Sequence, residues 1–198
     1  MPTPARTSLG EIVQTGRRIL EAEGLDGLTM QRVAAEVGVR APSLYKHVRD
    51  RAHLIHLINS TVARELADML QASLGHASPA EDLAAMADAY RAFAHAQPEA
   101  YGLMFARVPE SWRVEPELSE RAAAPVLRLA ASLAGPEHAL DAARLIAAWA
   151  NGFVSMELAD TFRLGGDLDA AFRFGVERLS TALVVGHGIA TPGDGAAH

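Results

Sequence analysis

Polar and cationic side chains gather in one short stretch of the N-terminal quarter, which contains the only lysine of the chain. Lys46 and Arg51 are predicted to bind phosphates, because cationic groups near a DNA backbone add affinity by releasing counterions. Tyr45 and His47 can donate hydrogen bonds to phosphate oxygens or pack on a sugar, although Tyr45 could instead pack among its own helices. Thr29, just before this stretch, can present its hydroxyl and its backbone N–H in the same way. This chemistry is typical of a protein that holds the backbone of duplex DNA.

Side chains that could read bases lie at the start of the same stretch. Arg40 could bind guanine O6 and N7 with both ends of its guanidinium, and its alternative is a solvated surface arginine. Ser43 could contact several base edges, while Ala41 or Pro42 could touch a thymine methyl. Gln31, farther upstream, could pair with an adenine edge. The sequence therefore predicts base contacts as well as phosphate contacts.

Two helices and a glycine turn are expected to position these side chains. Thr29 is a candidate N-cap, Gly38 a candidate C-terminal stop in the left-handed conformation, and Pro42 a candidate first-turn residue. The inward faces are supplied by apolar residues at helical spacing, namely Val33, Ala34, Val37, Leu44 and Val48. We predict a helix-turn-helix whose second helix enters the major groove.

The rest of the chain carries helical start and stop signals throughout. Helix N-caps are predicted at Ser8, Asp50, Ser78 and Asp167. A helix is expected to bend or break at Pro125, and an almost wholly apolar helix is expected over 140–164. No segment alternates apolar and polar residues convincingly with period two. We expect an all-α fold of about nine helices.

Several short motifs resemble the TetR family of one-component transcriptional regulators. They are Gly27-Leu28-Thr29, Val33-Ala34-Ala35-Glu36-Val37-Gly38-Val39, Ser43-Leu44-Tyr45-Lys46-His47-Val48 and Arg51-Ala52-His53-Leu54. The resemblance covers roughly residues 8–70, and Pro42 makes it similar to the tetracycline-repressor-like branch. Trp149-Ala150-Asn151-Gly152 looks like the WHG-type C-terminal domain, with Asn151 where that type has a histidine. The resemblance implies a homodimer, a ligand cavity in each subunit, and repression that an effector releases.

Charge is distributed unevenly along the chain, which suggests a small nucleic-acid-facing module joined to an acidic body. Residues 1–51 carry a net charge of +2 and the remainder carries −8, which gives the overall −6. We predict a DNA-binding head over 1–51, with a connecting helix over about 50–75. A ligand-binding and dimerisation body is predicted over 52–186, and a Gly-, Pro- and Ala-rich disordered tail over 187–198.

Aromatic and apolar residues of the body could line an effector cavity, although core packing is the alternative for each of them. The predicted ligand-binding residues are Met86, Tyr90, Phe93, His95, Tyr101, Phe105, Trp112, Trp149, Asn151 and Phe153. A small apolar or aromatic molecule is the expected effector, because such a cavity offers few polar contacts.

The last two helices supply the predicted dimer interface. Its residues are Phe153, Met156, Glu157, Leu168, Phe172, Val176, Leu179 and Leu183. A two-fold dimer would place two heads about one helical turn of DNA apart, or a multiple of it, so that they read a palindromic operator.

Other functions have weaker sequence support. His53 and His56 could hold a metal, but no third ligand follows at helical spacing, and no cofactor is expected. Motifs of hydrolases, phosphate loops and zinc proteases are absent from the sequence, so we expect no enzyme. A sequence-tolerant architectural DNA-binding protein is the main alternative, and a helical enzyme is the second. The resemblance favours a repressor over an activator. The lack of cysteine and of any apolar run near 20 residues suggests a cytoplasmic protein without a membrane span.

Overall fold

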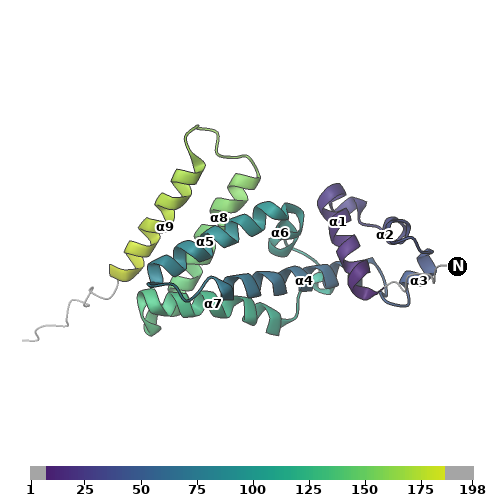
Figure 1. Cartoon of the computed structure of the whole chain (residues 1–198), viewed down its shortest axis with the longest axis horizontal. Coiled ribbons are helices and arrows are strands. Elements are labelled where there is room, and N and C mark those ends of the chain that lie inside the picture. The colour runs from purple at the N-terminus through teal and green to yellow at the C-terminus, as the bar shows by residue number, and fades with distance from the viewer. Residues whose placement is uncertain (1–7, 186–198) are drawn as a thin grey trace, which may run out of the picture. The chain divides into compact units, whose positions relative to one another are not determined.

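The structure, a computed structural model, describes residues 8–185. Within those residues it contains nine α-helices, two short 3-10 helices and no strand (Figure 1). The predicted all-α fold of about nine helices is confirmed. The disordered tail predicted at 187–198 lies outside the described residues.

The helices follow one another through short connections. They are α1 (Leu9–Gly27), α2 (Met30–Val37), α3 (Ala41–Leu44), α4 (Arg51–Ala72), α5 (Pro79–Ala96), α6 (Pro98–Phe105), η1 (Glu110–Trp112), α7 (Pro116–Ala134), η2 (Pro136–His138), α8 (Ala139–Leu158) and α9 (Leu168–Val185). The described residues form two compact units, one of 8–66 with 94–120 and the other of 67–93 with 121–185. Helices α4 and α5 therefore contribute to both units.

The first unit has a core between α1, α2, α3 and the start of α4. Its fully buried side chains include Ile12, Leu20, Leu28, Val33, Leu44, Val48, Leu54 and Ile58. Helix α4 approaches α1 closely at Gly16, where an added Cβ would lie 3.1 Å from Ile58 Cδ1. A small residue at this position lets the two helices pack directly against each other.

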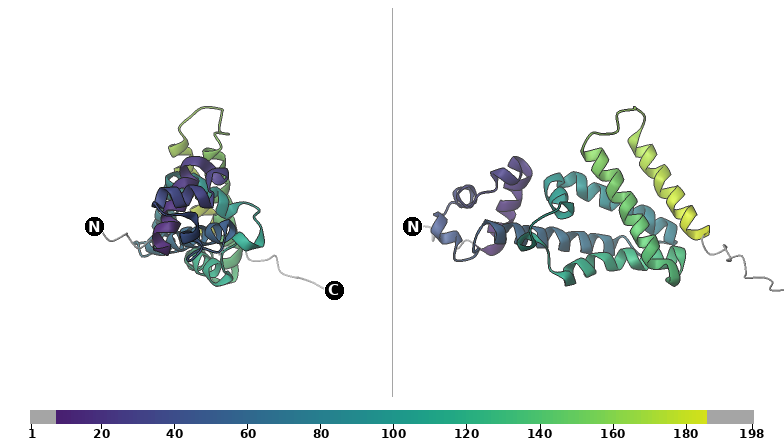
Figure 2. Two further views of the ribbon diagram at one scale, coloured as in Figure 1. Left: turned by 90° about the vertical axis from the view of Figure 1, so that its right-hand side faces the viewer. Right: turned by 180° about the vertical axis from the view of Figure 1, so that it is seen from behind.

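The second unit contains a cluster of aromatic rings from α8 and α9, two neighbouring helices joined by the loop 159–167 (Figure 2). Phe172 is fully buried, and its ring lies 5.2 Å from the rings of both Trp149 and Phe153. At Gly175 an added Cβ would lie 2.2 Å from Trp149 Cζ2, so α9 needs a glycine here to accommodate the indole.

Local capping follows the sequence pattern closely. The predicted N-caps accept backbone N–H groups at Ser8 (3.2 Å), Thr29 (3.1 Å), Asp50 (2.8 Å), Ser78 (3.2 Å) and Asp167 (3.1 Å). Gly38 ends α2 with a φ of 77°, which is the left-handed conformation predicted for it. These caps are confirmed because each depends on residues within one helical turn.

Two expectations about helix extent are wrong, and a third is wrong in part. Helix α7 continues through Pro125, which is buried inside it, so the helix does not break there, and a bend at this proline stays a prediction. Helix α8 ends at Leu158 instead of reaching residue 164, since Asp160, Gly165 and Gly166 all have positive φ values. The recognition helix is shorter than expected: α3 ends at Leu44, and only a hydrogen-bonded turn continues through His47.

Candidate nucleic-acid interface

Helix α3 is held by a small apolar core beneath it. Val33, Leu44 and Val48 are completely buried, so one side of α3 and of the following turn is fixed against α2. The bond from the Val48 N–H to the Leu44 carbonyl, at 2.9 Å, ties this turn to the end of α3. The other side faces solvent.

The residues predicted to contact DNA from this exposed side divide by exposure. Pro42, Tyr45, Lys46, His47 and Gln31 are exposed, while Ala41 and Ser43 are half-buried. Tyr45 retains 53% of its surface, so packing among its own helices is not its role. None of the predicted positions of α3 and its turn is buried, so each stays a candidate for contact with DNA.

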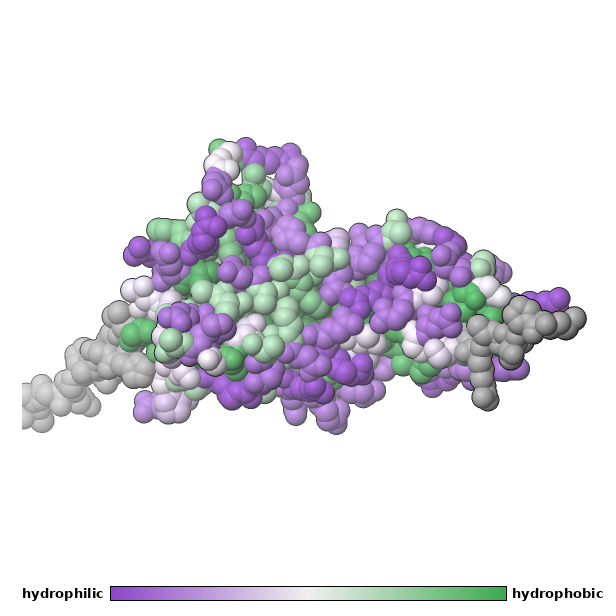
Figure 3. All heavy atoms as spheres, in the orientation of Figure 1, coloured by the Kyte–Doolittle hydropathy of each residue, from purple (hydrophilic) through white to green (hydrophobic). Residues whose placement is uncertain are grey.

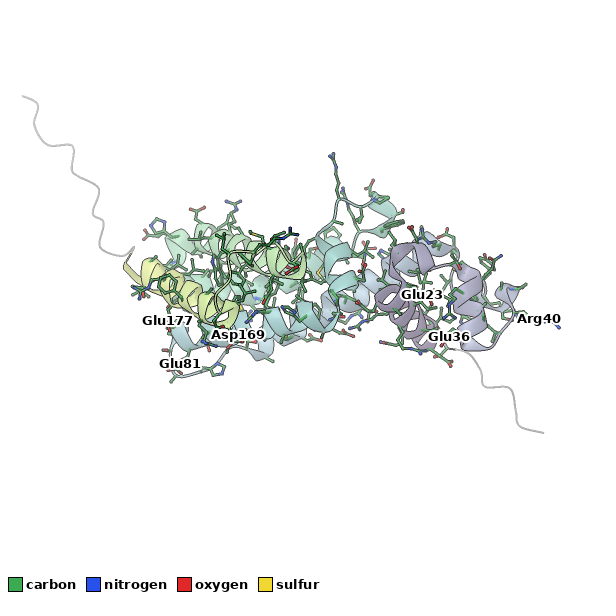
Figure 4. The ribbon with its side chains drawn as sticks, turned by 90° about the horizontal axis from the view of Figure 1, so that it is seen from above. Glu23, Glu36, Arg40, Glu81, Asp169 and Glu177 are labelled. Carbon is green, nitrogen blue, oxygen red and sulfur yellow. The ribbon has the colours of Figure 1, made fainter. Side chains whose placement is uncertain are left out.

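Arg40 occupies the N-cap position of α3 and its side chain points away from the helices of the head (Figure 4). Among the described residues it has no ion-pair partner. Its guanidinium is therefore available to a ligand, in contrast to Arg32 of the preceding helix. Arg32 bridges Glu23 and Glu36, and its pKa is raised first by the hydrogen bond to Glu23.

Arg51 does not match its predicted role as a phosphate contact. Its Nε donates to the Leu28 carbonyl at 2.6 Å and its Nη2 to the Leu25 carbonyl at 2.5 Å. The guanidinium also lies 5.9 Å from the centre of the Trp112 ring. Arg51 therefore braces the connection between α1 and α2, since its donors are committed to backbone carbonyls.

His53 lies at the junction between the α3 turn and α4. Its Nδ1 accepts the Arg49 N–H at 3.1 Å, which requires that this nitrogen carry no proton. Burial lowers the pKa of His53, and the neighbouring charges of Arg49 and His56 lower it further. The junction is therefore arranged for a neutral imidazole. His53 and His56 do not belong to any cluster of three potential metal ligands in the described part of the chain.

Sequence reasoning missed how α1 is joined to α6. The Glu21 carboxylate accepts the N–H groups of Glu99 (3.1 Å) and Ala100 (2.9 Å), which are free donors in the first turn of α6. Arg17 donates to Glu65 at 2.7 Å and also to Gln97. Pro98 is the first residue of α6, but no local pattern indicates a capping group some eighty residues away in the sequence.

The predicted ligand-binding residues are divided between the two compact units. Met86, Tyr90, Phe93, Trp149, Asn151 and Phe153 belong to the second unit, and His95, Tyr101, Phe105 and Trp112 to the first. In the second unit the Tyr90 hydroxyl lies 3.5 Å from Asn151 Oδ1, and Trp149 packs on Phe153. In the first unit Tyr101 is buried with its ring 5.0 Å from that of Phe105.

Several predicted dimer contacts are core residues of a single chain. Phe172, Val176, Leu179 and Leu183 are all at least nine-tenths buried within it. The carboxylate of Glu157 pairs with Arg91, whose pKa is raised chiefly by that bond. The dimer prediction is wrong for the four α9 residues, because the stripe that the sequence shows on α9 packs inside its own unit. Glu157 lies on α8, and its contact with a second copy stays a prediction.

Other apolar side chains of α8 and α9 do reach the surface. Leu145 and Met156 on α8 are 48% and 46% exposed, and Phe174 on α9 is 61% exposed. Figure 3 shows apolar patches among the hydrophilic surface of this helix pair. Between Leu145 and Met156 on α8 lies Gly152, where an added Cβ would meet nothing within 4 Å.

Among residues 8–185, no helix is both long and apolar enough to cross a membrane.

Comparison with known proteins identifies both parts of the chain. Residues 12–58 match the family model of bacterial regulatory proteins of the tetR family, and residues 83–179 match that of tetracyclin repressor-like C-terminal domains. An HTH-type transcriptional regulator of Mycobacterium tuberculosis is 32% identical, over 91% of this chain and 83% of its own.

Two further proteins are similar over different extents. The HTH-type transcriptional repressor DrrR1 of Streptomyces coeruleorubidus is 43% identical over 32% of this chain and 23% of its own. The crystal structure of ActR from Streptomyces coelicolor, in complex with (S)-DNPA, matches the fold with a TM-score of 0.68. It is 24% identical and covers 92% of this chain and 99% of the other.

Proposed function

The chain belongs to the TetR family and is a DNA-binding transcriptional regulator, and from this premise we propose that it is a homodimeric repressor that a small effector releases from a palindromic operator. The family and the curated relatives are regulators rather than enzymes. We further propose that the chain acts in the cytoplasm, where it would meet its operator. The observation that carries the proposal is the exposed face formed by Arg40, Lys46 and His47 over a buried support.

Contacts with DNA would divide between reading and positioning. Arg40, at the entrance of α3, would read a guanine, with Ala41, Pro42, Ser43 and Gln31 beside it. Lys46, Tyr45 and His47 would hold phosphates, and Thr29 would contribute from the start of α2. We propose residues 1–51 as the DNA-binding head and 52–186 as the body, although 52–66 and 94–120 group with the head as one compact unit.

The dimer would form through the exposed apolar side chains of α8 and α9. A single chain leaves three apolar side chains of these helices in contact with water, namely Leu145, Met156 and Phe174. Burying them against a partner would be favourable in free energy. Gly152 supports this assignment: glycine in a helix costs about 1 kcal/mol relative to alanine, and no atom of residues 8–185 comes close enough to require it. A close-packed second copy would supply the reason.

The effector would act through the body. DrrR1 is a repressor, and ActR is a TetR family protein whose structure was solved in complex with (S)-DNPA, which supports a ligand-released mode here. Ligand-induced movement of α6 would reach the head directly, because Glu21 of α1 caps the first turn of α6.

Operator selection tests this proposal. Purified protein would be used to select bound duplexes from a random pool, and the affinity of the selected site would be compared with unrelated DNA at physiological salt. We expect a palindrome that binds roughly 10³-fold or more tightly than unrelated DNA. A ratio near one would instead support the sequence-tolerant architectural function.

A further inference from the structure

Two arginines lie on either side of Asp50, where the turn after α3 leads into α4. Arg51 directs its Nε and Nη2 to two backbone carbonyls of the α1–α2 connection. The side chain of Arg49 is exposed instead, and within residues 8–185 its guanidinium forms no ion pair. Of these two arginines, Arg49 is therefore the one whose charge is available to a ligand.

Arg49 follows directly on the exposed turn that contains Lys46 and His47. Val48 is completely buried between them, while Lys46 and His47 are exposed. Consecutive Cα atoms are about 3.8 Å apart, so the Cα of Arg49 lies within about 7.6 Å of that of His47. A DNA strand whose phosphates contact Lys46 and His47 is therefore within reach of a long arginine side chain at this position.

His53 holds the backbone of this junction at two points. The Asp50 carboxylate accepts the backbone N–H of His53 at 2.8 Å, and Nδ1 of the His53 ring accepts the backbone N–H of Arg49 at 3.1 Å. The two bonds are a variation on the capping box, in which a side chain in the first helical turn returns to the backbone ahead of the helix. The backbone of Arg49 is thereby fixed by a hydrogen bond and by the buried Val48 before it.

The acceptor in this capping arrangement carries no negative charge. Glu or Gln is the usual residue at this position of a capping box, and a carboxylate there would attract the Arg49 guanidinium and repel a phosphate. Burial lowers the pKa of His53, and the charges of Arg49 and His56 lower it further against the opposite effect of Asp50. The imidazole is therefore neutral at pH 7.5, and it holds the Arg49 backbone without compensating the charge of the side chain.

We propose that Arg49 is a phosphate contact of the DNA-binding head and that His53 is the residue that positions it. The Arg49 guanidinium donates to a phosphate beside those held by Lys46 and His47, and the imidazole fixes the backbone from which the side chain extends. The proposal rests on the proposed function, because it needs a head that binds duplex DNA. It transfers to Arg49 the phosphate contact that the sequence pattern predicts for Arg51.

Salt titrations of DNA binding test the Arg49 contact. Each lost phosphate contact lowers the slope of log K against log salt by about 0.9, so the ratio of affinities at about 50 and 200 mM salt should be about 3.5-fold smaller per head for Arg49→Gln than for wild type. We expect this change on operator and unrelated duplexes alike. Arg64→Gln is the matched control, because that exposed arginine lies about 20 Å along α4 from its first residue. A wild-type slope in Arg49→Gln, or an equal fall in Arg64→Gln, would overturn the proposal.

Variants of His53 test the positioning role at pH 7.5. His53→Leu removes the acceptor of the Arg49 N–H and should lower the salt slope, whereas His53→Asn offers Oδ1 in place of Nδ1 and should keep it. In the Arg49→Gln background, His53→Leu should cause no further change, because no guanidinium is left to position. A wild-type slope in His53→Leu, or an equal effect of this substitution with and without Arg49, would refute the positioning role.

The Arg49→Gln titration remains decisive if His53→Leu fails to fold, because Arg49 is exposed. The same measurements separate this proposal from the proposed function. Specific operator binding with an unchanged slope in Arg49→Gln refutes the Arg49 contact alone. A wild-type protein that binds no duplex refutes the DNA-binding head and the Arg49 contact together.

Discussion

Arg40 and Arg51 flank the same short helix, yet their surroundings give them different roles. Arg40 projects from the start of α3 without an ion-pair partner in the described part of the chain. Arg51 uses its guanidinium on two carbonyls of the α1–α2 connection. At the scale of single residues, exposure and committed hydrogen bonds therefore separate a candidate DNA contact from a structural brace.

Replacing Arg40 with alanine should relax base preference. If Arg40 reads one guanine, Arg40→Ala should reduce discrimination at that base pair by about 1–3 kcal/mol, because a bidentate contact is lost. Affinity for a matrix of operator variants would measure this. If the variant kept the wild-type base preference at every position of the operator, Arg40 would be a solvated surface arginine that reads no base.

Lys46 should contribute affinity without sequence preference. Lys46→Ala is expected to weaken binding to specific and unrelated DNA alike and to lower the slope of log K against log salt by about one phosphate contact. A salt titration of wild type and variant would show it. Arg144→Gln is a suitable control, because that exposed arginine lies on α8. An unaltered slope would remove Lys46 from the phosphate contacts.

His53 should make stability depend on pH. Its pKa is lowered in the folded chain from the ordinary 6.5, mainly by burial, so the unfolded chain binds the proton more readily. The stabilisation is complete above about pH 6.5 and is lost as the pH falls through the folded pKa, together with the Arg49 N–H bond. Urea unfolding at pH 7.5 and 5.5 should show a larger loss for wild type than for His53→Asn. An equal loss in both proteins would contradict this.

At the scale of elements, the first turn of α6 depends on a carboxylate from another helix. Glu21→Ala leaves the N–H groups of Glu99 and Ala100 without their acceptor and should destabilise the chain by about 1 kcal/mol. Faster amide hydrogen exchange at these two residues would locate the effect. Asp26→Asn on the same helix is the matched control. Protection that stays at the wild-type level would argue against the cap.

Helix α9 shows how an element can be predicted correctly while its buried face is misassigned. The stripe from Leu168 to Leu183 indicates an amphipathic helix, and α9 is one. The stripe does not say which surface covers it, and the structure covers it with α8 and the rest of the same unit. Phe174 is exposed and lies outside this stripe, so apolar spacing alone would not have identified it as a candidate dimer contact.

At the scale of the whole molecule, the proposed dimer gives Gly152 a testable role. Gly152→Leu should improve helix propensity by a few tenths to ~1 kcal/mol, yet it should weaken self-association if a partner packs there. Gly102→Leu on α6 is the matched control, because that glycine also has open space around it. Sedimentation at micromolar concentration would compare the two. A Gly152→Leu protein that remains fully dimeric would exclude this part of α8 from the interface.

The sequence by itself determined the order and nature of the helices and the presence of a helix-turn-helix. Each cap at Ser8, Thr29, Asp50, Ser78 and Asp167 depends on neighbours within about four residues, so local chemistry was sufficient. The exposed face of α3 was predictable for the same reason. Leu44 and Val48 lie four residues apart and identify the buried side of this segment, so the polar side is the one that can contact DNA.

Tertiary structure alone decided the partners that lie far apart along the chain. Arg51 meets carbonyls 23 and 26 residues away, Glu21 caps a helix 78 and 79 residues away, and Asn59 is buried against Trp112 across 53 residues. At such separations many residues could serve as the hydrogen-bond partner of a charged or amide group, and only the packing of the helices determines which one does. Packing therefore turned the donors of Arg51 toward backbone carbonyls instead of phosphates, and it buried the apolar stripe of α9.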